Sequence, residues 1–414
     1  MSYIRTLFRH PLAFFASANV LLFALLSIYK NTFELGAILI GLTVLALTFI
    51  TYFIITKFKW GDPYIFLITS MLVNIGIAML YRLNPTLGTK QIGWYVLGII
   101  TYLLVYAAFQ FVPIWHKLKW MYFGVSMGLF ILVLLVGTRI SGAKNWLSFG
   151  EFSFQPSEVI KILFVLFFAC YYCNPRPIPK KSEDGKPPTR TLLQKLVSTL
   201  LLMCFCGFLI LQREWGSTVL LFLTFLALLY IYEHDFKLIL INLCGMTIVG
   251  SLGVLLLRHI QIRFTTWLDP WATVDTSGFQ IAQSLFAIAA GDFFGTGLGL
   301  GMPNLIPEVY SDFIFAAICE EFGIFGGVSV VLLFFILIYR GFKIALKADG
   351  FYKCVALGMT ILLGFQTFII IGGVIKLIPL TGITLPFISY GGSSLLASFA
   401  MVGILQAISV ERKN

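Results

Sequence analysis

Residues 33–56 read FELGAILIGLTVLALTFITYFIIT, and Glu34 is the only charged residue among them. A helix needs roughly 20 apolar residues to cross a hydrocarbon core about 30 Å thick. Stretches of this kind recur along the 414-residue chain, which is 59% hydrophobic and 11% charged. A soluble domain has about 25% charged residues. The sequence therefore predicts an all-α, polytopic integral membrane protein.

The lengths of the apolar runs predict about twelve transmembrane helices. We expect them at residues 11–29, 33–56, 63–81, 92–112, 119–138, 157–173, 193–211, 215–232, 237–257, 311–339, 351–375 and 385–409.

The formal net charge is +11, which a nucleic-acid-binding protein would share. Here the basic residues lie in short loops between spans, which is typical of the positive-inside pattern of membrane proteins. With the N-terminus inside, the inner segments hold about 18 Lys and Arg and the outer segments about 9. The sequence therefore predicts that both termini are cytoplasmic and that the protein has no nucleic-acid partner.

Two of the predicted loops are long. Residues 174–192 are rich in Pro, Lys and Arg without an apolar period, which favours a flexible cytoplasmic linker. Residues 258–310 contain many aromatic residues and lie outside in this topology. Loops of this length are usually functional or disordered, and the aromatic content argues against disorder. We expect a partly helical, partly membrane-embedded loop with a short amphipathic helix at 279–290.

The segment 142–161 reads GAKNWLSFGEFSFQPSEVIK, and its Pro156-Ser157-Glu158 is a plausible helix start. Glu158 and Lys161 are three residues apart, so they share a helix face and can form an ion pair. Ionisable residues inside a span usually face a polar cavity. Two interpretations remain open, namely an ion pair that stabilises the helix start and direct contact with a substrate.

Two further segments place charged residues near or inside spans. The turn 212–217, QREWGS, puts Arg213 and Glu214 at the external surface, either as a functional pair or as an ordinary charged hairpin. In PEVYSDFIFAAICEEFG (307–323), Asp312 opens a span, and Glu320 lies about 12 Å deeper, next to Glu321. Acids at that depth need a partner or a water-filled cavity, so we predict a polar core there.

Glycine and proline interrupt two other segments. Residues 295–301, GTGLGLG, lack the strand and helix of a dinucleotide site and predict a tight turn. Residues 378–394, IPLTGITLPFISYGGSS, break the apolar pattern just before and within the start of the last span. Broken backbone at membrane depth is tolerated where it is buried in protein or lines a cavity. This segment, which includes Ser389 and Ser393, therefore indicates a site.

The chain resembles the SEDS family (RodA, FtsW, SpoVE) over about residues 64–410. Five segments carry the resemblance in order: GAKNWLSFGEFSFQPSEVIK, QREWGS, LDPWATVDTSGFQIAQSLFAIAAGDFFGTGLGLG, PEVYSDFIFAAICEEFG and PLTGITLPFISYGGSS. The family usually has ten spans. The resemblance therefore implies an additional N-terminal transmembrane hairpin at 1–60, followed by a SEDS glycosyltransferase domain at 61–414 with its external loop at 258–310.

The resemblance implies that lipid II is polymerised into β-1,4 glycan at the outer face of the cytoplasmic (inner) membrane. The family's Asp of the long loop falls at Thr273, so Asp275 becomes the expected catalytic base and Asp269 its rival. The family's other Asp, in the turn after the seventh span, is replaced by Glu214. The residues expected to bind substrate are Lys144, Glu158, Lys161, Arg213, Arg263, Lys376, Ser389 and Ser393. The expected polar core comprises Glu214, Asp312, Glu320 and Glu321.

Several cofactors, partners and roles are compatible with the sequence. A divalent cation such as Mg²⁺ or Mn²⁺ could help to neutralise the diphosphate, although the sequence shows no dedicated metal motif. The family works with a class B penicillin-binding transpeptidase, which is the expected partner. Elongation, division and sporulation are equally compatible with the sequence. The alternatives are a flippase or transporter of the same precursor, since buried acids and broken helices suit transporters, and a ligase for another lipid-linked glycan.

Overall fold

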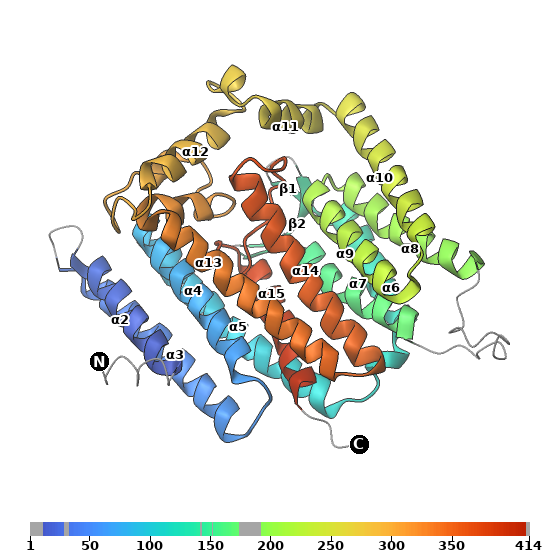
Figure 1. The fold of residues 1–414 in the computed structure, drawn as a ribbon, viewed down its shortest axis with the longest axis horizontal. Coiled ribbons are helices and arrows are strands. Elements are labelled where there is room, and N and C mark those ends of the chain that lie inside the picture. Colours follow the sequence, from blue (N-terminus) through green and yellow to red (C-terminus); the bar gives the residue numbers. More distant parts are fainter. Residues whose placement is uncertain (1–10, 29–32, 141–142, 151, 174–191, 411–414) are drawn as a thin grey trace. The chain divides into compact units, whose positions relative to one another are not determined.

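The computed structural model describes residues 11–28, 33–140, 143–150, 152–173 and 192–410 (Figure 1). Within this part of the chain, twelve helices are long and apolar enough to cross a membrane. Each predicted span corresponds to one of them, which confirms the predicted all-α, polytopic architecture. The linker predicted at 174–192 lies outside the described residues except for Leu192, where a helix begins.

The twelve long helices are α2 (Pro11–Ile28), α3 (Leu35–Lys57), α4 (Pro63–Leu83), α5 (Pro85–Phe111), α6 (Lys119–Val136), α7 (Pro156–Cys173), α8 (Leu192–Leu211), α9 (Trp215–Glu233), α10 (Phe236–Leu256), α13 (Ile314–Lys347), α14 (Gly350–Val374) and α15 (Gly392–Ser409). The shorter elements are α11 (Arg258–Leu268), α12 (Phe279–Gly291), the 3₁₀ turns η1 (Trp115–Lys117), η2 (Trp271–Thr273) and η3 (Pro303–Leu305), and the strands β1 (Thr138–Ile140), β2 (Ala143–Phe149) and β3 (Phe152–Phe154).

Local sequence explains where several helices begin. Asp62 caps α4 by accepting a hydrogen bond of 3.0 Å from the Tyr64 amide, and Pro63 occupies the first helical position. Helix α7 begins at Pro156, as predicted. Helix α5 begins at Pro85, seven residues before the predicted start, because its first turns carry polar residues that lie outside the apolar run.

Three short antiparallel strands, in the order β1-β2-β3, connect α6 to α7. The sequence did not predict them. Strands of three to seven residues are too short for a clear two-residue period, and a helix start immediately follows them.

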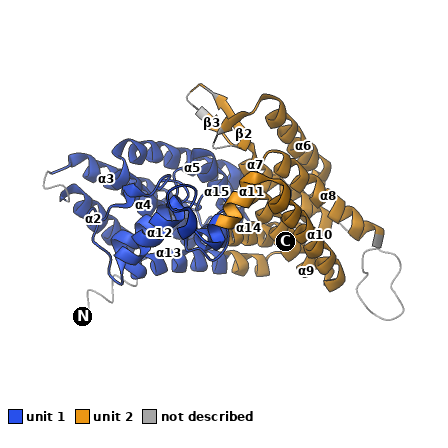
Figure 2. Ribbon diagram, turned by 90° about the horizontal axis from the view of Figure 1, so that it is seen from above, with its two compact units in different colours: residues 1–111, 266–340, 366–414 blue, residues 112–265, 341–365 orange. Residues whose placement is uncertain are grey.

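The chain forms two compact units, coloured separately in Figure 2. Unit 1 comprises residues 1–111, 266–340 and 366–414, and unit 2 comprises residues 112–265 and 341–365. In unit 1, α15 packs closely against α5, and a Cβ at Gly403 would lie 2.7 Å from the Tyr102 carbonyl oxygen. In unit 2, α6 packs on α7 and α8 packs on α9.

The first two helices are joined to the rest of unit 1 by polar contacts. The Asn19 side-chain amide of α2 donates a hydrogen bond of 2.7 Å to the Asn74 side chain of α4. Thr48 of α3 lies 2.9 Å from the Tyr95 hydroxyl of α5, which in turn donates to Ser70. Hydrogen bonds between buried side chains are a common means of joining transmembrane helices. The N-terminal hairpin is therefore an integrated part of unit 1.

Candidate functional site

The predicted site residues are divided between the two units, and each group is described within its own unit. Unit 1 contains Asp275, Asp312, Glu320, Glu321, Lys376, Ser389 and Ser393. Unit 2 contains Lys144, Glu158, Lys161, Arg213, Glu214 and Arg263.

The two rival carboxylates of the long loop have different surroundings in unit 1. Asp269 accepts hydrogen bonds from the backbone amides of Trp271 (3.0 Å) and Ala272 (3.2 Å), so it caps the 3₁₀ turn η2. Asp275 is exposed, and no described residue donates a hydrogen bond to its carboxylate. Helix α12 begins after Gly278 without a side-chain cap, so Asp275 does not cap it either. The carboxylate of Asp275 is therefore accessible to a reacting group, whereas that of Asp269 already accepts two hydrogen bonds from backbone amides.

Thr273, at the position where the resemblance places an acid, is part of the same turn. Its carbonyl accepts hydrogen bonds from the amides of Thr276 (3.0 Å) and Gly278 (2.8 Å). Its hydroxyl is shielded from solvent and has no hydrogen-bond partner among the described residues. An un-ionised hydroxyl is a poor proton acceptor at neutral pH, which leaves the base function to a nearby carboxylate.

The helix predicted at 279–290 is present as α12, and it packs close to the end of α14. Ser284 of α12 donates a hydrogen bond of 3.4 Å to the carbonyl of Val374. The Trp267 indole donates one of 3.1 Å to the carbonyl of Lys376. These contacts hold both ends of the loop that carries Asp275 against the segment that follows α14.

The polar core predicted at Glu320 and Glu321 is present, and both acids have partners. The guanidinium of Arg82, at the end of α4, forms an ion pair with Glu321 and donates a hydrogen bond of 2.6 Å to the carbonyl of Gly301. Glu320 accepts a hydrogen bond of 2.6 Å from the amide of Met302. The two acids and Arg82 thus hold the turn at 295–301 against α13.

A kink in α13 makes this arrangement possible. Gly323 has φ +69°, a conformation that interrupts the helix and strongly favours glycine. The amides of Thr296 and Gly297 donate to the carbonyls of Glu320 (2.9 Å) and Glu321 (3.1 Å). The glycine-rich segment therefore forms the tight turn that was predicted, docked on the kink. Asp312 lies two residues before the start of α13 at Ile314.

The segment 378–391 is irregular, and α15 begins only at Gly392. The Ser389 hydroxyl donates to the Ser311 carbonyl (2.6 Å) and accepts from the Leu385 amide (2.9 Å). Ser393 is buried in the first turn of α15. Ser389 thus lies inside the irregular segment, which its two hydrogen bonds hold in place, whereas Ser393 lies just after it in α15.

In unit 2, the predicted pair at the start of α7 is confirmed. Lys161 Nζ lies 2.8 Å from Glu158 Oε2, and both side chains are almost completely buried. Removing one partner of a buried ion pair leaves an unpaired charge, which typically costs about 3–5 kcal/mol.

We expect Glu158→Ala and Lys161→Ala each to lower the yield of folded protein, with partial rescue in the double variant, because the double change leaves no lone charge. Size-exclusion chromatography and thermal unfolding of the detergent-purified variants measure this. Full yield with selective loss of activity in either single variant would instead assign the pair to substrate contact.

The turn between α8 and α9 places its two charged residues differently. Arg213 is exposed, as predicted, and has φ +64°. Glu214 was predicted at the external surface but is buried, and Gln155 (3.0 Å) and Ser157 (3.1 Å) donate hydrogen bonds to its carboxylate. Burial raises the pKa of the Glu214 carboxyl above its ordinary value, although these hydrogen bonds act in the opposite direction.

Basic residues from three segments lie near this turn in unit 2, although the ammonium of Lys144 donates a hydrogen bond to the carbonyl of Leu134. The Lys144 amide donates a hydrogen bond of 3.2 Å to the Gln212 carbonyl, which joins β2 to the turn. A Cβ at Gly253 would lie 3.0 Å from the Trp215 ring and 3.1 Å from Ile260, so the start of α11 lies close to the start of α9. We call Lys144, Arg213, His259 and Arg263 the basic cluster.

His259 is the member of the basic cluster that the sequence did not reveal. Burial lowers its pKa, and the positive charges of Arg213 and Arg263 lower it further. Its Nε2 atom is buried and has no hydrogen-bond partner among the described residues. Arg263 lies four residues after His259 on the same helix, whereas Arg213 comes from a distant turn that only the fold brings near.

Among the described residues, no group of three or more His, Cys, Asp or Glu side chains is placed to hold a metal ion.

Comparison with known proteins decides the family. A profile for FtsW, RodA and SpoVE, described as "Cell cycle protein", matches residues 53–414. The chain belongs to this family. Its match to the peptidoglycan glycosyltransferase RodA of Mycobacterium tuberculosis is 33% identical over 425 residues, covering 95% of this chain and 88% of the relative. Stage V sporulation protein E of Bacillus subtilis is 32% identical, with 86% of this chain and 98% of the relative covered.

A solved structure also resembles the chain. One chain of a peptidoglycan synthase complex that structurally coordinates polymerization and crosslinking matches with a TM-score of 0.69 and 25% identity. The match covers 84% of this chain and 97% of the other. The chain therefore shares the fold of that protein.

Proposed function

We propose that this family member is a peptidoglycan glycosyltransferase that polymerises lipid II into β-1,4 glycan at the outer face of the cytoplasmic membrane. The observation that carries the proposal is the 33% identity, over 95% of the chain, to a relative named for this activity. The contacts of the loop and of the basic cluster support it, because they supply the two chemical functions that the reaction needs.

The first function is to accept a proton. The 4-hydroxyl of one sugar attacks the anomeric carbon of another, and its proton must pass to a base as the new bond forms. Asp275 fits this role, since its carboxylate is exposed and no described residue donates a hydrogen bond to it. Asp269 fits less well because two backbone amides already donate to it.

The second function is to stabilise the departing undecaprenyl diphosphate. Positive charges placed where negative charge develops lower the barrier, so this reaction needs no general acid. The basic cluster of unit 2 offers Lys144, Arg213 and Arg263, and Lys376 of unit 1 is a further candidate. Arginine binds phosphate oxygens through two parallel hydrogen bonds, whereas lysine acts as a point charge. Mg²⁺ or Mn²⁺ carried by the substrate would assist the same neutralisation.

The structural relative is part of a peptidoglycan synthase complex, which supports a partner that crosslinks the glycan. We infer that this partner is a class B penicillin-binding transpeptidase. Co-purification of the tagged chain with each transpeptidase of its host identifies it.

The decisive experiment supplies purified protein with labelled lipid II. Glycan polymer formed in detergent is the expected result. Movement of lipid II across the bilayer of proteoliposomes without polymer would instead support a flippase, and polymer formed only from another lipid-linked glycan would support a ligase.

The topology is also testable. We expect both termini and residues 174–192 to be cytoplasmic and residues 258–310 to be external, because the Lys and Arg bias favours this orientation. A cysteine introduced at Gly185 should stay unlabelled by an impermeant maleimide in intact cells, whereas one at the exposed Thr276 should be labelled. Labelling of the Gly185→Cys variant in intact cells would overturn the orientation, and the parent chain controls for the seven existing cysteines.

A further inference from the structure

Helices α2 and α3 form a hairpin that the proposed reaction does not use. The family profile begins at residue 53, so α2 and most of α3 lie outside it. The buried Asn19–Asn74 and Thr48–Tyr95 contacts nevertheless fix the hairpin to the core of unit 1. These contacts fix the positions of α2 and α3 relative to the core of unit 1, and a cavity lies between the two helices.

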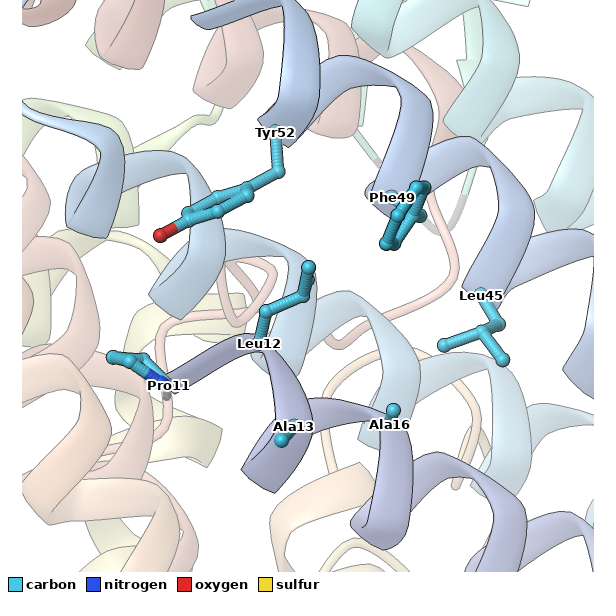
Figure 3. A pocket seen from close by; sticks show the side chains of 7 residues that line it. All are labelled: Pro11, Leu12, Ala13, Ala16, Leu45, Phe49 and Tyr52. Carbon is cyan, nitrogen blue, oxygen red and sulfur yellow. The ribbon is translucent and has the colours of Figure 1, made fainter. Parts of the chain in front are cut away.

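The cavity arises from the sizes of the residues that face each other along the hairpin. At one level Phe23 of α2 packs directly against Gly41 of α3, where a Cβ would lie 2.7 Å from Phe23 Cβ. Toward the end where α2 begins and α3 ends, α2 instead presents Ala13 and Ala16, whose side chains are too small to fill the space. A cavity of about 400 Å³ opens there (Figure 3).

The lining of this cavity is almost entirely apolar. It consists of Pro11, Leu12, Ala13, Ala16, Leu45, Phe49 and Tyr52. The Tyr52 hydroxyl is the only polar side-chain group in this lining, and tyrosine is enriched where a membrane meets water. Both helices are apolar enough to span a membrane. Lipid acyl chains would therefore surround them and could enter the cavity.

The volume distinguishes a lipid tail from a protein helix. A cavity of about 400 Å³ lies within the range of roughly 300–1,000 Å³ found for small-ligand pockets. A spanning helix, about 30 Å long and 10 Å across, occupies on the order of 2,000 Å³. The space thus suits one hydrocarbon chain and is several times too small for a helix.

Positive charge lies at the same end of the hairpin. Lys57 is the last residue of α3, five residues after Tyr52, and its ammonium lies over the rings of Phe53 and Phe58 at the end of this helix. Lys59 follows in the next turn. Among the described residues, no carboxylate forms an ion pair with either lysine, since the nearby Asp62 pairs with Arg340. Unpaired lysines at a membrane surface attract anionic lipid head groups.

We propose that the cavity between α2 and α3 is a binding site for an anionic phospholipid, whose acyl chain occupies the apolar space and whose head group contacts Lys57 and Lys59. The lining of its cavity lies outside the part of the chain that the family profile matches. This site is independent of the glycosyltransferase reaction, so its test needs neither lipid II nor activity.

The test is native mass spectrometry of the full-length, detergent-purified protein mixed with equal amounts of phosphatidylglycerol and phosphatidylethanolamine. The parent chain should retain phosphatidylglycerol preferentially. Ala16→Phe, which fills the cavity, should lower its retention about tenfold, equivalent to about 1.4 kcal/mol. Ala13→Leu should also lower the retention of phosphatidylglycerol. Leu21→Phe, at an exposed position of α2 away from the lining, is the matched control and should leave retention unchanged.

The head-group contact is tested by Lys57→Gln combined with Lys59→Gln. This change should abolish the preference for phosphatidylglycerol, whereas Lys90→Gln, which removes an exposed charge elsewhere in unit 1, should preserve it. The proposal fails if both cavity variants bind lipid as the parent does, or if removing the lysines leaves the preference intact. It also fails if Ala16→Phe spares lipid retention but abolishes binding of a co-expressed transpeptidase, since the occupant would then be a partner helix.

Discussion

The Asp275→Asn variant should polymerise lipid II roughly 10²-fold or more slowly than the parent chain, the scale expected for loss of a general base. Asparagine has nearly the same size as aspartate but cannot accept a proton at neutral pH. The side chain of Asp275 is exposed and accepts no hydrogen bond from a described residue, so the fold does not depend on its charge. Membrane expression, thermal unfolding and lipid II binding should therefore stay normal while the turnover rate falls.

Asp269→Asn is the matched control in the same loop. Asp269 accepts hydrogen bonds from the amides of Trp271 and Ala272, and the asparagine side-chain oxygen can accept the same bonds. We expect this variant to polymerise lipid II at close to the parent rate. A normal rate for Asp275→Asn together with a large loss for Asp269→Asn would transfer the base function to Asp269.

A rescue experiment tests how the family position relates to Asp275. Thr273 and Asp275 lie within three residues of each other in one turn, and the Thr273 hydroxyl has no described hydrogen-bond partner. Introducing Thr273→Asp into the Asp275→Asn variant should restore part of the activity, because it returns a carboxylate to the position where the resemblance places one. If Asp275→Asn and Asp269→Asn are both fully active, the single-carboxylate mechanism at this loop is wrong, and Glu320 and Glu321 become the next candidates.

The spans and the broken segments could be predicted because their signals are local. Twenty apolar residues need no distant partner to identify a transmembrane helix. Likewise, the glycines at 295–301 predict a turn, and the prolines and glycines at 378–394 predict an irregular segment. The structure has a tight turn at 295–301 and an irregular segment before α15, as these residue types favour.

The partners of the charged residues could not be predicted, because the fold brings them together from distant parts of the chain. Glu158 and Lys161 are three residues apart and were predicted to pair, as they do. Arg82 and Glu321 are 239 residues apart, and Arg82 falls just outside the span predicted at 63–81. Glu214 is buried for the same reason, since Gln155 and Ser157 reach it from 59 and 57 residues away.

The Arg82→Gln variant should lose about 3–5 kcal/mol of unfolding free energy, because the charge of Glu321 would be left buried without its partner. Side-chain exposure is 7% for Arg82 and 0% for Glu321, so water cannot replace the guanidinium. Arg82 also donates to the Gly301 carbonyl, so the 295–301 turn should loosen and polymerisation should fall as well. Denaturant or thermal unfolding in detergent measures the stability, and the lipid II assay measures the activity.

Two further variants separate the loss of this pair from a general effect of removing an arginine. Combining Arg82→Gln with Glu321→Gln should recover part of the stability, since no lone charge remains. Arg340→Gln breaks the Arg340–Asp62 pair of the same unit, whose side chains are 24% and 20% exposed, and should cost only about 1 kcal/mol. Equal losses in Arg82→Gln and Arg340→Gln, or no recovery in the double variant, would mean that the stability does not depend on the buried pair. A stable but inactive Arg82→Gln variant would instead place the guanidinium in contact with substrate.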